Sequence, residues 1–132
     1  MGMTVSAVMS VSLAPPLLAV CPQNSKYTLQ AIRSRGGFAV NFLASSQSDV
    51  SNKFAFGNQD KFAGVAWSRS PHIEATVLED VRAYAECSVF RIIEAEDHTI
   101  IVGRILSGAV TDNRPLTYCS RRYVDLVYKL AS

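Results

Sequence analysis

The sequence predicts a mainly β protein with short helices, folded as a closed or nearly closed antiparallel barrel. Apolar and small polar residues alternate over residues 3–13, which is the side-chain period of a strand. Two long runs of strand-forming residues, 83–95 and 99–111, are joined by Glu96-Asp97-His98 and predict an antiparallel hairpin. The helical segments are short and do not alternate regularly with strands, which argues against a parallel α/β sheet.

The composition indicates one domain, residues 1–132, with part of its surface covered by another chain. Only 18% of the residues are charged and 48% are apolar, whereas about 25% charged residues is typical. A net charge of +2 is too small to predict binding to nucleic acid or to an acidic membrane surface. No run of about eighteen apolar residues is present, so we expect no membrane span.

The cysteines and histidines predict neither a disulfide framework nor a metal site. Cys21, Cys87 and Cys119 are an odd number at wide spacing, and neither His72 nor His98 has a second ligand at zinc spacing. We therefore expect buried free thiols in a reducing compartment, which predicts a cytoplasmic protein without a metal.

The stretch SVSLAPPLLAVCP, residues 10–22, has two interpretations. A secretory signal requires an early positive charge, yet the first charged residue is Lys26. The alternation favours a strand over residues 3–13, in which the odd-numbered, apolar side chains face the core. Its hydroxyl-bearing face is expected to meet either a subunit interface or a ligand. Ala14-Pro15-Pro16 ends this strand, and residues 17–21 predict a second, short and buried strand.

A helix is expected after Pro22. Asn24 or Ser25 can cap it, Leu29 and Ile32 form its apolar stripe, and Gly36-Gly37 ends it.

The first turn of this helix carries Ser25, Lys26 and Thr28. Free amides, the positive end of the helix dipole, two hydroxyls and an ammonium group suit an anion. Ordinary helix capping explains the same residues, and the residue pattern leaves both interpretations open.

Further along the chain, residues 38–43 predict a buried strand in which Asn41 needs a hydrogen-bond partner. Ser46 and Asp49 have the spacing of a capping box and predict a second short helix. The stretch up to Asp80 is typical of irregular surface structure.

Within the second long strand, Gly103 predicts a bulge or a close backbone approach. Asp112-Asn113 turns the chain, and the last segment predicts either a strand or a short helix.

Five separated motifs resemble the flavin reductase-like family with the FMN-binding split-barrel fold. They are GMTVSAVMSVSLAPPLLAVC, FAVNFL, DKFAGVAW, DHTIIVGRI and PLTY…RRY, in the family's order, and they extend from Gly2 to about Tyr123. The family contains the small reductase components of two-component flavin monooxygenases. The resemblance implies FMN, with FAD as the alternative, and NADH or NADPH as the hydride donor.

The resemblance also implies roles for particular residues. The hydroxyl-bearing strand would face the flavin ring, the helix start would hold the flavin phosphate, and further contacts would come from the segment after it. His98 and Tyr123 would act catalytically, with His98 near the nicotinamide, while the flavin carries the chemistry. The implied flavin contacts are Thr4, Ser6, Ser10, Val11, Ser12, Ser25, Lys26, Thr28, Asn41, Gln47, Ser51 and Phe54.

Two departures from the family pattern affect these expectations. Glu96 stands where the family usually has a glycine, next to the proposed nicotinamide site. The family's usual first helix and first barrel strand have no counterpart before Gly2, so we expect an unpaired sheet edge that a partner covers.

The resulting prediction is an NAD(P)H-dependent flavin reductase that supplies reduced flavin to a monooxygenase. The low charge content and the mean hydropathy of +0.14 add the expectation of a homodimer. The alternatives are a non-catalytic FMN-binding or dimerisation module of the same fold and an inactive truncated form.

Overall fold

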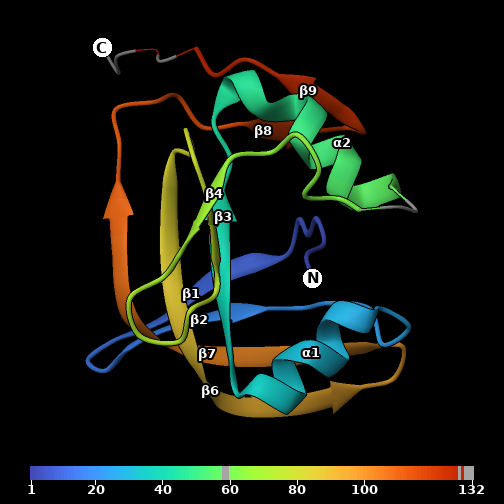
Figure 1. The fold of residues 1–132 in the computed structure, drawn as a ribbon, viewed down its shortest axis with the longest axis vertical. Coiled ribbons are helices and arrows are strands. Elements are labelled where there is room, and N and C mark those ends of the chain that lie inside the picture. Colours follow the sequence, from blue (N-terminus) through green and yellow to red (C-terminus); the bar gives the residue numbers. More distant parts are fainter. Residues whose placement is uncertain (58–59, 128, 130–132) are drawn as a thin grey trace.

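The computed structural model describes residues 1–57, 60–127 and 129. Strands dominate these residues, and the helices are short, as the sequence predicts (Figure 1). The strands are β1 Val8–Leu13, β2 Pro16–Val20, β3 Gly37–Phe42, β4 Trp67–Arg69, β5 Thr76–Leu78, β6 Ala83–Ala95, β7 His98–Val110, β8 Thr117–Cys119 and β9 Arg122–Val124. The helices are α1 Tyr27–Arg35, the 3₁₀ helix η1 Ser45–Gln47 and α2 Ser48–Phe56.

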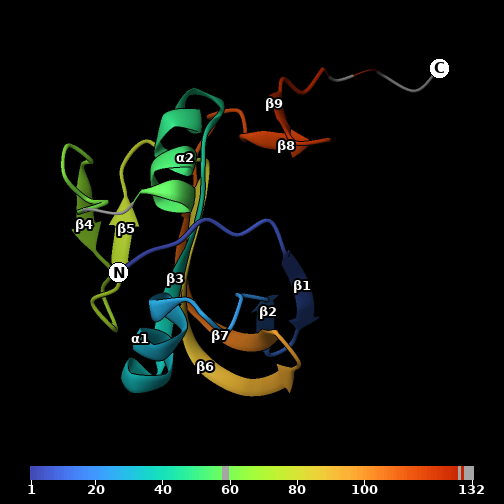
Figure 2. The same ribbon diagram turned by 90° about the vertical axis from the view of Figure 1, so that its right-hand side faces the viewer.

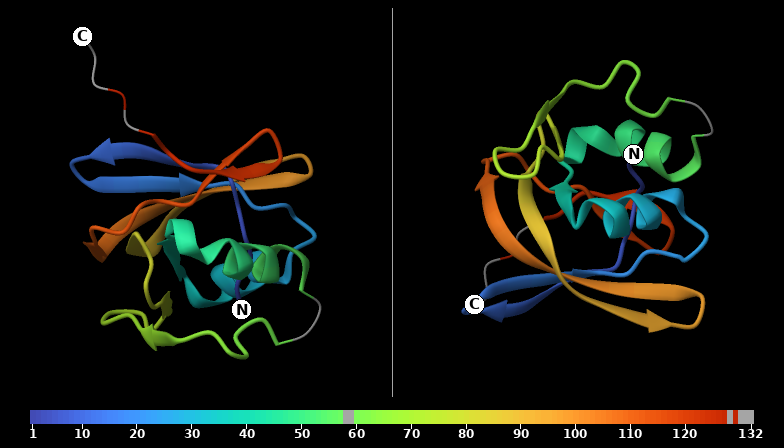
Figure 3. Two further views of the ribbon diagram at one scale, coloured as in Figure 1. Left: turned by 90° about the horizontal axis from the view of Figure 1, so that it is seen from above. Right: turned by 60° about the horizontal axis from the view of Figure 1, so that its bottom comes forward.

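A curved five-stranded antiparallel sheet in the order β1-β2-β7-β6-β3 forms the body of the molecule. Its centre is the predicted β6–β7 hairpin, in which Ala95 pairs with His98. Two register shifts, between Glu86 and Cys87 and between Val89 and Arg91, bend this hairpin, because each shift inserts an unpaired residue. In Figure 3 the β1–β2 hairpin and the turn of the β6–β7 hairpin point in opposite directions.

The main core lies between the sheet and α1. Leu29 and Ile32 are the buried residues of α1, which confirms the predicted apolar stripe. A Cβ atom at Gly103 would lie 2.6 Å from Phe38 Cζ and 2.8 Å from Cys87 Cβ, so the predicted close approach at this glycine is confirmed. A smaller cluster lies beside α2 and contains Phe54, Leu78 and Val81.

Glu86 on β6 is fully buried and binds the loop between β4 and β5 to the sheet. Its carboxylate accepts hydrogen bonds from the His72 amide (3.0 Å), the Ile73 amide (2.8 Å) and the Ser107 hydroxyl (2.9 Å). Burial raises the pKa of this group, but hydrogen bonds from Ser70, Ile73, Ser107 and His72 outweigh it and lower the pKa from 4.5 to about 2. Glu86 is therefore a structural carboxylate that stays ionised.

The N-terminal strand prediction is partly wrong. Residues 3–7 lie outside any strand, and in β1 the predicted core face is exposed: Met9 is 61% exposed and Leu13 91%. The physical reason is that β1 lies at the edge of the sheet and pairs with β2 alone. The next prediction, a short buried strand over residues 17–21, is confirmed by β2.

Both helix starts differ from their predictions. Lys26 is the N-cap residue of α1 and makes no side-chain capping bond, because its ammonium group has no acceptor for the helix amides, and the predicted caps Asn24 and Ser25 lie before it. At the second helical segment, Gln47 Oε1 accepts a hydrogen bond from the Ala44 amide (2.9 Å), and this contact replaces the predicted Ser46–Asp49 capping box.

Three further expectations need correction or completion. The stretch up to Asp80 is not wholly irregular, since β4 and β5 pair within it. Cys87 is buried, but Cys21 is half-buried and Cys119 exposed, so the expectation of buried thiols holds for one of the three. The last segment forms the β8–β9 hairpin, the strand alternative.

In the described part of the chain, no helix is long and apolar enough to cross a membrane.

Candidate functional site

A cavity of about 260 Å³ lies between the N-terminal segment, the loop before α1 and the β6–β7 turn. Figure 2 shows the N-terminal segment passing between α2 and α1 on its way to β1. The residues that line the cavity are Met3, Thr4, Val5, Ser6, Ala7, Cys21, Pro22, Gln23, Lys26 and His98.

One wall of the cavity is the segment of residues 3–7. Its backbone lies outside the sheet, and Ala7 O accepts a hydrogen bond from the Cys21 amide (3.3 Å). Among the described residues, the N–H groups of residues 3–7 donate no hydrogen bond. This wall therefore contains backbone N–H groups and a Ser6 hydroxyl, which are donors of the kind that a ligand with oxygen acceptors requires.

The opposite wall carries Lys26 and His98. Lys26 lies at the start of α1, where its ammonium group adds to the positive end of the helix dipole. His98 Nδ1 lies 2.8 Å from Asp97 Oδ1, so Nε2 is the ring nitrogen left for a ligand. The hydrogen bond from His98, followed by its charge, lowers the pKa of Asp97.

Four of the predicted site residues therefore line one cavity: Thr4, Ser6, Lys26 and His98. Ser25 and Thr28 flank Lys26 in sequence but do not line the cavity. Ser10, Val11 and Ser12 lie on β1, outside the lining.

Asn41 and Gln47 hold the segment around β5. Asn41 accepts a hydrogen bond from the Leu78 amide (2.8 Å) and donates one to Thr76 O (3.1 Å). Gln47 accepts from the Ala44 amide and donates to Glu79 O (2.8 Å). The partner that Asn41 requires is therefore the backbone of β5.

The remaining predicted residues gather around α2. The Tyr123 hydroxyl lies 2.9 Å from Ser51 Oγ and donates to Asn52 Oδ1 (2.9 Å). Phe54 is buried in the smaller core. The Thr4 hydroxyl donates to Ser51 O (2.6 Å), so Thr4 connects this group to the cavity wall. Tyr123 does not line the cavity.

The sequence reasoning missed the loop Cys21-Pro22-Gln23 as a cavity wall. Cys21 was expected in the core as the last residue of the predicted buried strand, but β2 ends at Val20 and Cys21 is half-buried. The loop's position between that strand and the Lys26 helix start was the available signal.

Comparison with known proteins defines the class to which this fold belongs. The family model for the flavin reductase like domain matches residues 1–126. A flavin reductase (NADH) of Kitasatospora aureofaciens is 40% identical over 125 residues, covering 92% of this chain and 65% of the relative. The stachydrine N-demethylase reductase subunit of Rhizobium meliloti is 41% identical over 122 residues, covering 92% of this chain and 53% of the relative.

A solved structure gives the same result for the fold. The NADH:FAD oxidoreductase of Streptomyces globisporus, in complex with NAD and FAD fragments, covers 95% of this chain and 76% of its own, with a TM-score of 0.90 and 27% identity. The predicted fold class, a mainly β split barrel, is confirmed. The chain belongs to the flavin reductase-like family. It spans 65% and 53% of the lengths of the two relatives described above.

Proposed function

We propose that this chain is an NAD(P)H-dependent flavin reductase, and that the cavity between residues 3–7 and Lys26 receives the flavin. The observation that carries the proposal is the combination, around one cavity, of a lysine at a helix start, a histidine and backbone N–H groups that have no partner among residues 1–57, 60–127 and 129. The similar Kitasatospora protein is named as a flavin reductase that uses NADH, which supports the same activity here.

The chemistry of the lining fits a flavin. Backbone donors of residues 3–7 and the Ser6 hydroxyl can bind carbonyl oxygens of the ring, and Lys26, with Ser25 and Thr28, can bind the phosphate at the start of α1. A cavity of about 260 Å³ is smaller than the roughly 300–1,000 Å³ of typical ligand sites, so it would enclose one part of the flavin. When bound, the flavin supplies the ring that accepts a hydride from NAD(P)H.

His98 is the residue we assign to the nicotinamide side of the cavity. It is partly exposed, with 44% of its side chain accessible, and Asp97 fixes its orientation through Nδ1. Asn41 and Gln47 each donate one hydrogen bond to the backbone and accept one from it, so we assign them to holding the segment around β5. We propose FMN in preference to FAD, and comparing the dissociation constants of the two flavins tests this choice.

For assembly, we propose a homodimer that delivers reduced flavin to a monooxygenase in the cytoplasm. The exposed apolar side chains of β1, Met9 and Leu13 among them, are suited to an interface, and a stable one buries roughly 2,000 Å² or more. The Rhizobium relative is named as a reductase subunit, which supports an oxygenase partner. Free thiols support a reducing compartment. Sedimentation tests the dimer, and a folded monomer that binds FMN would refute it.

The test of the activity is NAD(P)H oxidation with and without added FMN, in the wild-type chain and in two histidine variants. His98→Gln should slow oxidation about tenfold or more. His72→Gln, at the other histidine, lies outside the cavity and should leave the rate unchanged. FMN binding without NADH or NADPH oxidation would refute the enzyme and favour the flavin-binding module. Equal effects of the two histidine variants would remove His98 from the site.

A further inference from the structure

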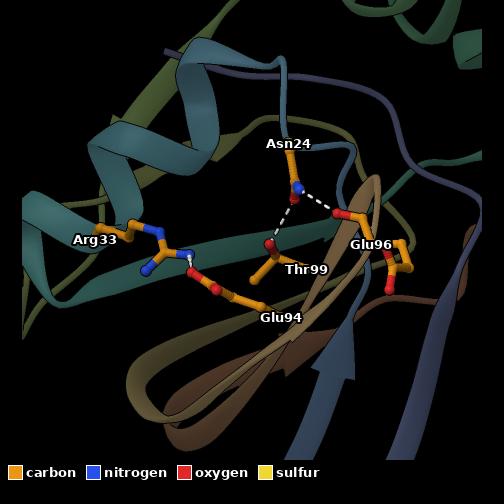
Figure 4. A network of polar contacts seen from close by, with 5 residues as sticks. All are labelled: Asn24, Arg33, Glu94, Glu96 and Thr99. Carbon is orange, nitrogen blue, oxygen red and sulfur yellow. Dashed lines mark hydrogen bonds and ion pairs between the residues drawn. The ribbon is translucent and has the colours of Figure 1, made fainter.

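We propose that Asn24 is a positioning residue that holds the His98 turn against the start of α1; this inference rests on the proposed function. The Asn24 amide nitrogen donates to Glu96 O (2.6 Å), and its carbonyl oxygen accepts from the Thr99 hydroxyl (2.6 Å) (Figure 4). Glu96 and Thr99 lie on either side of His98 in sequence. The Asn24 side chain therefore forms hydrogen bonds with residues on both sides of His98.

Backbone contacts place Asn24 at this point and show that its segment follows the turn closely. The Asn24 amide donates to Asp97 O (2.9 Å), and the Thr99 amide donates to Pro22 O (3.0 Å). Gln23 and His98 form an isolated antiparallel bridge. The loop before α1 is therefore hydrogen-bonded directly to the β6–β7 turn, and the side chain of Asn24 adds two further bonds between them.

The turn needs such support because Glu96 adopts a φ of +54°, in the left-handed region that glycine tolerates better. The hydrogen bond from Asn24 to the Glu96 carbonyl fixes the orientation of the following peptide group. Thr99 is buried, with 1% of its surface exposed, so its hydroxyl has little access to water as an alternative partner.

An asparagine is required chemically, because the contact uses one donor and one acceptor of the same amide. Aspartate at this position would keep the acceptor for Thr99 but would set a carboxylate oxygen against the Glu96 carbonyl. Alanine would remove both contacts. Asn24→Asp therefore removes only the hydrogen bond to the Glu96 carbonyl, whereas Asn24→Ala removes both hydrogen bonds.

The structure also supplies a matched control. Arg33 on α1 pairs with Glu94 on β6 at 3.3 Å, which joins the same helix to the same hairpin. Both side chains are well exposed, 40% and 77%, and in the described part of the chain neither makes a side-chain hydrogen bond to Asn24, Glu96 or Thr99, although Glu94 lies opposite Thr99 in the β6–β7 pairing (Figure 4). Exposed pairs of this kind contribute little, so Arg33→Ala changes a link between the same elements without releasing the turn.

Removing the Asn24 side chain should affect the reaction with NADH much more than the binding of FMN. Among the described residues, Asn24 makes no hydrogen bond to Lys26 or to residues 3–7, so its removal should leave FMN binding almost intact. His98 should lose its fixed position, and kcat/KM for NADH should fall about tenfold. Faster hydrogen exchange at residues 96–99 should accompany this loss.

The experiment measures kcat/KM for NADH, the Kd for FMN and hydrogen exchange in the wild type, Asn24→Ala, Asn24→Asp and Arg33→Ala. The inference predicts about a tenfold fall in kcat/KM for both Asn24 variants, FMN Kd values within about twofold of wild type, and no change for Arg33→Ala. Three results would overturn the inference alone. The first is a wild-type kcat/KM in the Asn24 variants, and the second is an FMN affinity that falls as much as kcat/KM does. The third is a fall in kcat/KM in Arg33→Ala as large as in the Asn24 variants. A wild-type chain that oxidises neither NADH nor NADPH would overturn the proposed function, and the inference with it.

Discussion

The burial of Glu86 leads to a quantitative prediction about acid stability. The carboxylate has a pKa of about 2 in the folded protein against 4.5 as its ordinary value, because its hydrogen bonds outweigh the effect of burial. The unfolded chain therefore binds more protons between these two values. The stabilisation is fully present above about pH 4.5 and is lost as the pH falls toward 2. At 1.36 kcal/mol per pKa unit, it amounts to about 3 kcal/mol.

The perturbation is Glu86→Gln, which removes the charge and sets an amide N–H₂ against groups that are themselves donors. At neutral pH, we expect the free energy of unfolding to fall by about 2–3 kcal/mol. The matched control is Glu94→Gln on the same strand, where the side chain is 77% exposed, and its change should stay within about 0.5 kcal/mol.

Urea denaturation at several pH values is the assay, with the difference between wild type and Glu86→Gln as the readout. This difference should be largest at neutral pH and should shrink as the pH falls below about 4.5. An unchanged stability of Glu86→Gln at neutral pH would refute the reasoning. A difference that does not depend on pH would refute the assignment of a low pKa to Glu86.

Three more predictions concern single side chains. Lys26→Ala should weaken FMN binding by roughly 1.5–3 kcal/mol and the binding of riboflavin, which lacks the phosphate, much less; equal losses in a binding titration would show that Lys26 does not bind the phosphate. Gly103→Ala should lower the free energy of unfolding by about 1–3 kcal/mol, because its Cβ would meet Phe38 and Cys87 at 2.6 and 2.8 Å; a wild-type melting curve would contradict this packing. Tyr123→Phe should lower stability by about 1 kcal/mol and leave NADH oxidation within about twofold, since the hydroxyl contacts α2; a large loss of rate with FMN bound would instead support the catalytic role that the family resemblance implies.

The sequence predicts the fold well where local pattern and packing agree. The β6–β7 hairpin and the α1 stripe follow from long runs and regular spacing, and both are present. The N-terminal strand fails because alternation indicates an extended chain but not which elements cover its faces. β1 is a sheet edge, so the apolar face that alternation assigns to the core is exposed.

The site is predicted less completely, because hydrogen-bond partners depend on contacts far apart in the sequence. Lys26 and His98 were identified from the sequence and do line one cavity. Asn24 forms hydrogen bonds with residues 72 and 75 positions away in the sequence, and no local sequence pattern predicts these contacts. Asn41 was expected to need a partner, but its position opposite β5 becomes visible only in the folded chain.

The central claim is that flavin binds in the cavity between residues 3–7 and the Lys26–His98 wall. The most direct measurement is a titration of the isotope-labelled chain with FMN, followed by NMR of the backbone amides. The account predicts the largest shifts at residues 3–7, at the loop from Cys21 to Lys26 and at His98. Shifts confined to residues 10–12 of β1, with the cavity residues unchanged, would contradict it.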